Sequence, residues 1–244
     1  MEEFTFQIRR VAGRRRLSIT VRPDGSFWVS TNKTLSQKKI RSFLLEQMNW
    51  VRSSSETMEA LRAQNPRKRF QSGEIYPYLG NTYELVIEKG NPMRLQVQDG
   101  KMIFTSPVSE EKMSEEQRLY YQQKFQETYK KVAKKLLTNR LEFWSEIMGL
   151  ETMGLSFRMQ KSVWGSCSSK NKISLNMKLI VAPLEVLDYV VIHELAHIRH
   201  KNHSPSFWEL VETHTDHRHM AAKWLRDNVY LADFLGSKSD LHPS

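Results

Sequence analysis

Two histidines and a glutamate in the segment His193-Glu194-Leu195-Ala196-His197 have the types and spacing that could bind and use a metal ion. On an α-helix, side chains four residues apart lie on one face, about 5–6 Å apart at Cβ, so both imidazoles can reach one tetrahedral ion. Glu194 follows the first histidine and can act as a general base toward a water that the metal activates. The spacing therefore predicts a zinc-dependent hydrolytic site.

A further histidine follows this motif after a change of chain course. Asn202 tolerates left-handed backbone, and Pro205 disfavours helical geometry at Ser204. The helix should therefore end before His203, and the chain should turn back toward the motif. We predict His203, ten residues after His193, as the third ligand.

Three other side chains near the motif are weaker candidates for the third ligand. His200 lies seven residues after His193, which on a continuous helix is about 10.5 Å along the axis. Three rings spread along one straight helix cannot close a tetrahedron around one ion. Glu209 and Glu212 fall in the next helix; they suit hydrogen bonds to a ligand imidazole better, although coordination by either stays open.

The donor set indicates a catalytic site with one zinc ion per chain. Structural zinc sites close four protein ligands, often cysteines, whereas three histidines leave one position open. A structural zinc site and a solvated, histidine-rich helix end are the alternative interpretations. Cys167, the single cysteine, fits a small buried hydrophobe better than a nucleophile or a fourth ligand.

The elements that must position these residues follow from turn, capping and periodicity signals. Pro183 should open the helix that carries the motif, because proline is favoured in a first helical turn. Ser114 and Gln117 form a capping box for a long helix that Gly149 should end. The other predicted elements are strands at 4–8, 16–22, 26–30, 75–79, 83–87, 93–97, 102–105, 155–160 and 172–180, and a helix from Ser36 to about 63.

These elements predict an α+β protein, in which a β-rich N-terminal region and a long helix precede a catalytic core that contains the HExxH helix. We expect a first domain over residues 1–108 and a metallohydrolase core over residues 109–240. At 244 residues the chain is long enough for one large domain or two small ones.

Composition and charge narrow the class of protein. A hydrophobic content of 39% and a charged content of 26% describe a globular protein, and no apolar stretch is long enough to span a bilayer. The single cysteine and the lack of a secretory pattern at the start predict a cytoplasmic protein. The net charge of +10 permits weak, salt-sensitive binding of nucleic acid or nucleotides, although the basic clusters are widely dispersed.

The chain resembles a known family in a series of short motifs. These are Trp164–Ser168, Ile173–Asn176, Ala182-Pro183, Asp188–His197, Asn202–Ser204 and Phe207-Trp208. Together they resemble the YgjP-like metallopeptidase domain, which is grouped with the SprT- and WLM-type zincins.

The resemblance implies a peptide bond as the target, His193, His197 and His203 as zinc ligands, and Glu194 as the catalytic base. It also implies a strand beside the metal helix that pairs with an extended substrate, for which the segment Ile173–Leu179 is the candidate; an ordinary interior strand is the alternative. The chain departs from the metzincins, because His200 stands where they have glycine and Met220 lies in a helix-like segment.

Two further functions stay open at this point. The same metal and glutamate could hydrolyse a nucleotide phosphoanhydride, with arginine and lysine side chains neutralising the phosphates. A polyanion-binding protein with a residual metal site is the non-enzymatic alternative. Peptide or protein is the substrate that we expect, with no membrane partner.

Overall fold

The computed structural model describes residues 5–14, 16–21, 26–64, 68–160 and 163–235. The chain divides into two compact units, Met1–Arg67 and Lys68–Ser244. The predicted division after residue 108 is a different one and stays a prediction. Among the helices in the described ranges, none combines the length and the apolar character that are needed to cross a bilayer.

The first unit consists of a small mixed sheet and two helices. Strand β3 (Phe27–Thr31) lies in the middle, parallel to β1 (Phe6–Arg10) and antiparallel to β2 (Ser18–Val21). The predicted single helix after Ser36 is instead two helices, α1 (Gln37–Glu46) and α2 (Met48–Gln64).

The interruption between α1 and α2 lies at Gln47, which has φ −96° and ψ 3° and ends α1. Ser36 caps the start of α1, because its side chain accepts a hydrogen bond from the Lys39 amide. The apolar periodicity continues across Gln47, so hydrophobic spacing alone does not reveal the break.

The second unit begins with a four-stranded sheet and the long helix α3 (Glu115–Met148). The strand order is β4-β5-β7-β6, with β5 and β7 parallel and the two outer pairs antiparallel. The capping box of Ser114 with Gln117 is present, and Gly149 ends α3 with left-handed backbone at φ 61°. The bounds are β4 (Ile75–Tyr78), β5 (Asn81–Lys89), β6 (Leu95–Gln98), β7 (Lys101–Ser106) and the short 3-10 helix η1 (Glu110–Lys112).

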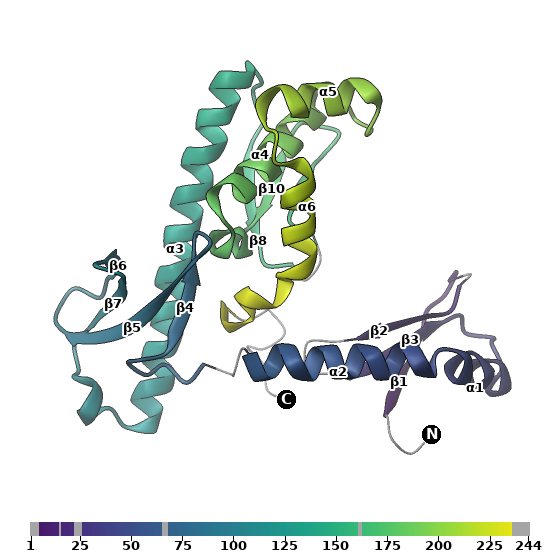
Figure 1. Cartoon of the computed structure of the whole chain (residues 1–244), viewed down its shortest axis with the longest axis horizontal. Helices are drawn as coiled ribbons and strands as arrows, with labels where there is room; N and C mark the ends of the chain where they lie inside the picture. The colour runs from purple at the N-terminus through teal and green to yellow at the C-terminus, as the bar shows by residue number, and fades with distance from the viewer. Residues whose placement is uncertain (1–4, 15, 22–25, 65–67, 161–162, 236–244) are drawn as a thin grey trace. The chain divides into compact units, whose positions relative to one another are not determined.

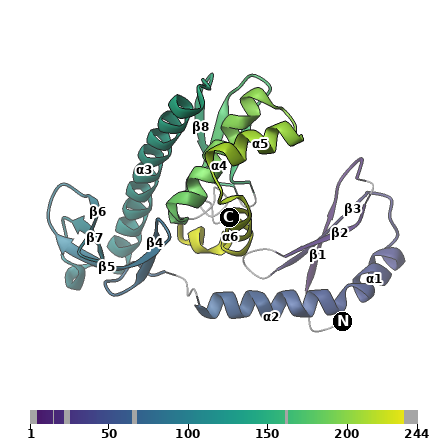
Figure 2. The ribbon, with the colours of Figure 1, turned by 45° about the horizontal axis from the view of Figure 1, so that its top comes forward.

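Most of the remaining elements of the second unit lie beside the C-terminal half of α3 (Figures 1 and 2). The four-stranded sheet and the 3-10 helices at 177–181 and 229–235 pack with its N-terminal half. The remaining elements are β8 (Leu155–Arg158), β9 (Gly165–Cys167), β10 (Ile173–Asn176), η2 (Met177–Val181), α4 (Leu184–Arg199), α5 (Pro205–His214), α6 (Arg218–Asp227) and η3 (Val229–Leu235). This arrangement confirms the predicted α+β class.

Helix α4 is held against α3 by apolar packing and one ion pair. Buried side chains of both helices belong to the same core cluster, which includes Leu141 of α3 and Val191 of α4. Arg140 donates two hydrogen bonds to the Asp188 carboxylate, from Nε at 2.7 Å and from Nη2 at 2.8 Å. A bidentate pair of this kind fixes direction as well as distance, so α3 sets the position of the helix that carries the HExxH motif.

Strand β10 corrects one prediction. It ends at Asn176, and the residues that follow form η2 instead of extending the strand to 180. The Asn176 side chain causes the change of course, because its Oδ1 accepts from the Lys178 amide while its Nδ2 donates to the Gln160 and Val163 carbonyls. In the sheet order β8-β10-β9, β10 is the middle strand, so the suggestion that Ile173–Leu179 is the substrate-pairing edge is wrong.

Candidate metal centre

Helix α4 brings His193 and His197 to one face. The opposite face of the helix is apolar and buried, with Ile192, Leu195 and Ala196 fully covered. The two imidazole rings lie 5.0 Å apart between centroids and are almost perpendicular, at 84°. The predicted four-residue spacing therefore places both rings where they can reach one metal ion.

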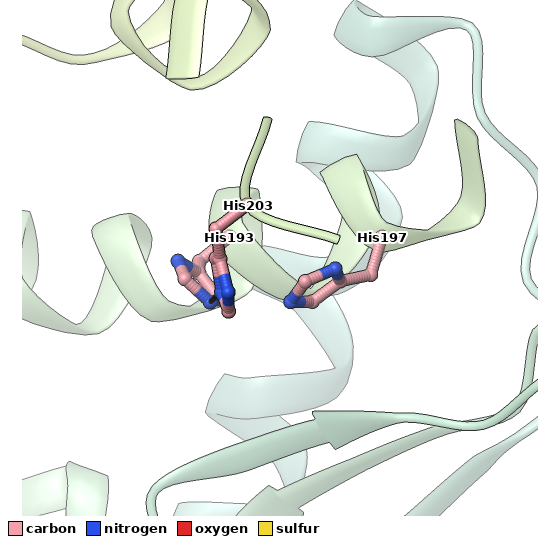
Figure 3. Close-up of side chains that lie close together, drawn as sticks. All are labelled: His193, His197 and His203. Carbon is pink, nitrogen blue, oxygen red and sulfur yellow. Dashed lines mark hydrogen bonds between the residues drawn. The ribbon is translucent and has the colours of Figure 1, made fainter. Parts of the chain in front are cut away.

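The chain turns after α4 and returns His203 to these two rings (Figure 3). The backbone is extended at His200, where α4 ends, and Ser204 then caps α5, with Pro205 in its first turn. His203 Nε2 lies 3.1 Å from His193 Nε2. One ligand atom from each of the three histidines lies within 4.8 Å of the others.

The spacing of these nitrogens fits a tetrahedral metal ion. Two nitrogens that each lie about 2.0–2.1 Å from such an ion are about 3.3 Å apart, close to the 3.1 Å between His193 and His203. His197 Nδ1 lies 3.0 Å from the His200 carbonyl oxygen. In the neutral tautomer Nδ1–H donates to this carbonyl, which leaves the lone pair of His197 Nε2 for a metal.

Burial favours the neutral form of His193 and His197, the form that metal binding needs. It lowers the pKa of His193 to about 3, with smaller contributions from His197, His203 and the cation of Arg218. Burial also lowers the pKa of His197. His193 Nδ1 is buried and has no hydrogen-bond partner among the described residues.

The three alternative ligands lie outside this cluster. His200 contributes its backbone carbonyl to His197, as described above. The Glu212 carboxylate accepts a hydrogen bond from Arg218 Nη1 at 2.6 Å. Among the described residues, the group that could hold a metal consists of His193, His197 and His203, and it does not include Glu209.

Two aromatic side chains of α5, Phe207 and Trp208, pack against the histidine rings. The sequence analysis did not predict these contacts. The Trp208 ring stacks on His203 at 22° and 5.4 Å, and Phe207 lies 4.6 Å from His197. The Arg218 guanidinium of α6 lies 3.5 Å from the centroid of Trp208. Because His203 is exposed, these contacts restrict an imidazole that solvent would otherwise leave free to rotate.

Glu194 is buried beside the histidines, with 6% of its surface exposed. Burial raises the pKa of its carboxyl to about 7, because a charged carboxylate is disfavoured away from water. Strand β9 covers this side chain at Gly165. A Cβ at residue 165 would lie 2.6 Å from Glu194 Oε1 and 2.7 Å from Glu194 Cγ, so only glycine leaves room for the carboxylate.

The close approach predicts a large effect of Gly165→Ala. The added methyl group must displace the Glu194 side chain. If Glu194 is the base that the sequence predicts, a shift of about 1 Å can lower the rate about 10²-fold. We expect peptide turnover to fall by about that factor while metal content stays unchanged. Gly90→Ala is the control, because its Cβ would crowd a side chain to a similar extent, with Thr105 Cγ2 at 2.7 Å, at a position outside the histidine cluster. Normal turnover in Gly165→Ala would contradict the predicted role of Glu194 as the base.

Strand β9 presents an open backbone edge. It pairs antiparallel with β10, and the flanking bonds Asn176 N to Trp164 O and Ser168 N to Lys172 O place residues 164, 166 and 168 toward β10. By the alternation of an antiparallel ladder, the amide and carbonyl groups of Gly165 and Cys167 point away from it. In the described part of the chain, β9 is an edge of its sheet.

Cys167 and Met220 have structural surroundings. Cys167 is half-buried on β9, and burial raises the pKa of its thiol, which disfavours the nucleophilic thiolate. It does not belong to the histidine cluster. Met220 lies on α6 and is 42% exposed, so it forms no turn beneath the histidines.

Comparisons with known proteins agree with the motif. The family model of the YgjP-like metallopeptidase domain matches residues 15–228. Among solved structures, the chain is similar to the metallopeptidase zymogen abylysin of Pyrococcus abyssi, with 28% identity over 38% of this chain and 90% of that chain. The TM-score of 0.33 gives no support to a shared overall fold. No curated protein sequence matches the chain.

Proposed function

Because the chain belongs to the YgjP-like metallopeptidase family, we propose that it hydrolyses peptide bonds with one bound zinc ion. The proposed ligands are His193, His197 and His203, and the proposed general base is Glu194. The observation that carries the proposal is the convergence of three imidazoles beside a buried carboxyl group.

Zinc, when bound, lowers the pKa of a water molecule and polarises the carbonyl that is attacked. Glu194 then accepts the proton from the attacking water on its carboxylate and delivers it to the departing amine. A carboxyl group whose pKa lies near 7 suits both steps, since it can take up and release a proton near neutral pH. Gly165 keeps β9 close while leaving the Glu194 carboxylate undisplaced.

We further propose that the substrate binds in extended form along β9. The outward amide and carbonyl groups of Gly165 and Cys167 can pair with a peptide backbone, as in strand addition to a sheet edge. Since Gly165 also contacts Glu194, a peptide on this edge runs past the proposed base. In this proposal, β9 has the substrate-pairing role that the sequence suggested for Ile173–Leu179.

Metal analysis tests the proposal. We expect about one zinc ion per chain after gentle purification, because three histidines suit zinc and leave one position open. A chelator should abolish peptide cleavage, and added zinc should restore it. Nucleotide hydrolysis measured in parallel, with and without chelator, separates the two hydrolase classes. A protein that retains no transition metal after zinc is added back would contradict the proposal, whereas another divalent metal would change only the ion.

A further inference from the structure

A hollow of about 320 Å³ opens on the sheet formed by β8, β10 and β9. Four serines, two cationic residues and Cys167 line it. The serines and cationic residues are Ser156, Ser166, Ser168, Ser174, Arg158 and Lys172.

The hollow lies on the face of the sheet that is turned away from α4. Ile173 and Leu175 of β10 are fully buried in the core that contains α4, so Ser174 between them points to the other face. The strand register pairs Ser174 with Ser156 of β8 and with Ser166 of β9. Paired residues share a face, and the three serines therefore line one surface.

The chemistry of the wall suits a carboxylate. Arg158 Nε donates to Ser174 Oγ at 3.1 Å, which holds the guanidinium over the middle strand. In the described part of the chain, neither Arg158 nor Lys172 forms an ion pair, and no acidic residue lines the hollow. Guanidinium, ammonium and hydroxyl donors bind carboxylate oxygens through charge-assisted hydrogen bonds.

A peptide along β9 would reach both faces of the sheet. Its side chains alternate, so that those beside Gly165 point toward α4 and the histidines, and their neighbours lie beside Ser166 on the face of the hollow. Strands in a sheet are about 4.7–4.9 Å apart. A side chain must therefore extend back across β9 to meet Lys172 or Arg158, which favours glutamate over the shorter aspartate.

We propose that this hollow is a binding site for an acidic side chain of the substrate, so that the protein prefers peptides with glutamate next to a residue that faces the metal ligands. This inference rests on the proposed peptidase function and on binding along β9. It adds a preference for a substrate class that the three histidines and Glu194 do not themselves determine.

Matched peptides test the preference. In each pair, one position near the cleaved bond is glutamate or glutamine, and kcat/KM is measured with the zinc-loaded protein. We expect glutamate to raise kcat/KM about three- to tenfold at one position, as two partly exposed charge contacts allow. The ratio should fall as salt increases, because the Debye length shortens from about 10 Å at 0.1 M to about 3 Å at 1 M.

Variants of the two cations connect the preference to the hollow. The double variant Arg158→Gln with Lys172→Gln should bring the ratio of kcat/KM for the glutamate and glutamine peptides close to one. The double variant Arg158→Glu with Lys172→Glu should instead favour a peptide with lysine at that position. The double variant Lys89→Gln with Lys101→Gln is the control, because it removes the same charge from exposed positions on β5 and β7. Zinc content and circular dichroism show whether each variant is folded.

Peptide binding to the Glu194→Gln variant gives a second readout that does not depend on turnover. Tighter binding of the glutamate peptide supports the subsite if this difference disappears when Arg158→Gln and Lys172→Gln are added. Equal cleavage of both peptides at every position, or a preference that survives in the double variant, overturns the subsite and leaves the peptidase function standing. If no peptide is cleaved, the peptidase function fails, and equal binding of both peptides to Glu194→Gln then overturns the subsite as well.

Discussion

Glu194→Gln should retain zinc and lose peptide turnover by about 10²–10⁴-fold, the range for removal of a general base. Glutamine keeps the size of the side chain in its confined position beside Gly165, but its amide does not accept the proton of the attacking water. Because Glu194 is buried, its replacement by a neutral amide of the same size leaves no unpaired charge in the core. The proposed ligands on α4 are unchanged, so zinc binding should persist.

The measurement is kcat for a cleaved peptide together with zinc content by elemental analysis. Glu185→Gln is the matched control, since it makes the same chemical change at an exposed position in the first turn of the same helix. It should alter turnover less than twofold. Full activity in Glu194→Gln would remove this residue from the role of base.

His203→Ala should weaken zinc binding more than 100-fold. Loss of a residue that only hydrogen-bonds to a metal ligand weakens binding by about 10–100-fold, and loss of a ligand itself should cost more. The variant leaves two histidines on α4 and removes the ring that reaches them from the segment after this helix, where His203 Nε2 lies 3.1 Å from His193 Nε2. His200→Ala should bind zinc almost as tightly as the parent, because His200 supports His197 through its backbone carbonyl, which alanine retains.

Competition with a chromophoric chelator measures zinc affinity in these variants and in Glu209→Ala and Glu212→Ala. The two carboxylates lie outside the histidine cluster, so their removal should have little effect. Unchanged affinity in His203→Ala, combined with a large loss in one of the other three variants, would show that the third ligand has been assigned to the wrong residue.

The local part of the site could be predicted from the sequence because it depends on short-range geometry. Two histidines four residues apart share a helix face whatever surrounds the helix. The return of His203 follows from a helix end and a capped restart at Ser204-Pro205, which are properties of neighbouring residues. The convergence of these three rings was therefore predictable without knowledge of the fold.

The contacts between distant segments were not predictable in this way. Gly165 lies close to Glu194 across 29 positions of sequence, and one glycine in a turn-rich segment carries no sign of that contact. Strand β10 alternates apolar and polar residues, a pattern that suits an edge or an interior strand equally, and only its pairing with β8 and β9 decides between them. The break at Gln47 is also hidden, because the residues on both sides favour helix.

The stack of Arg218 on Trp208 has a consequence for the smallest fragment that can hold the site. The three histidines end at residue 203, and a fragment that stopped after α5 would contain all of them. It would nevertheless lack the guanidinium that lies 3.5 Å from the Trp208 ring, a contact worth about 0.5–2 kcal/mol. Trp208 in turn restricts His203. The boundary of the metal centre therefore extends into α6, fifteen residues beyond its last histidine.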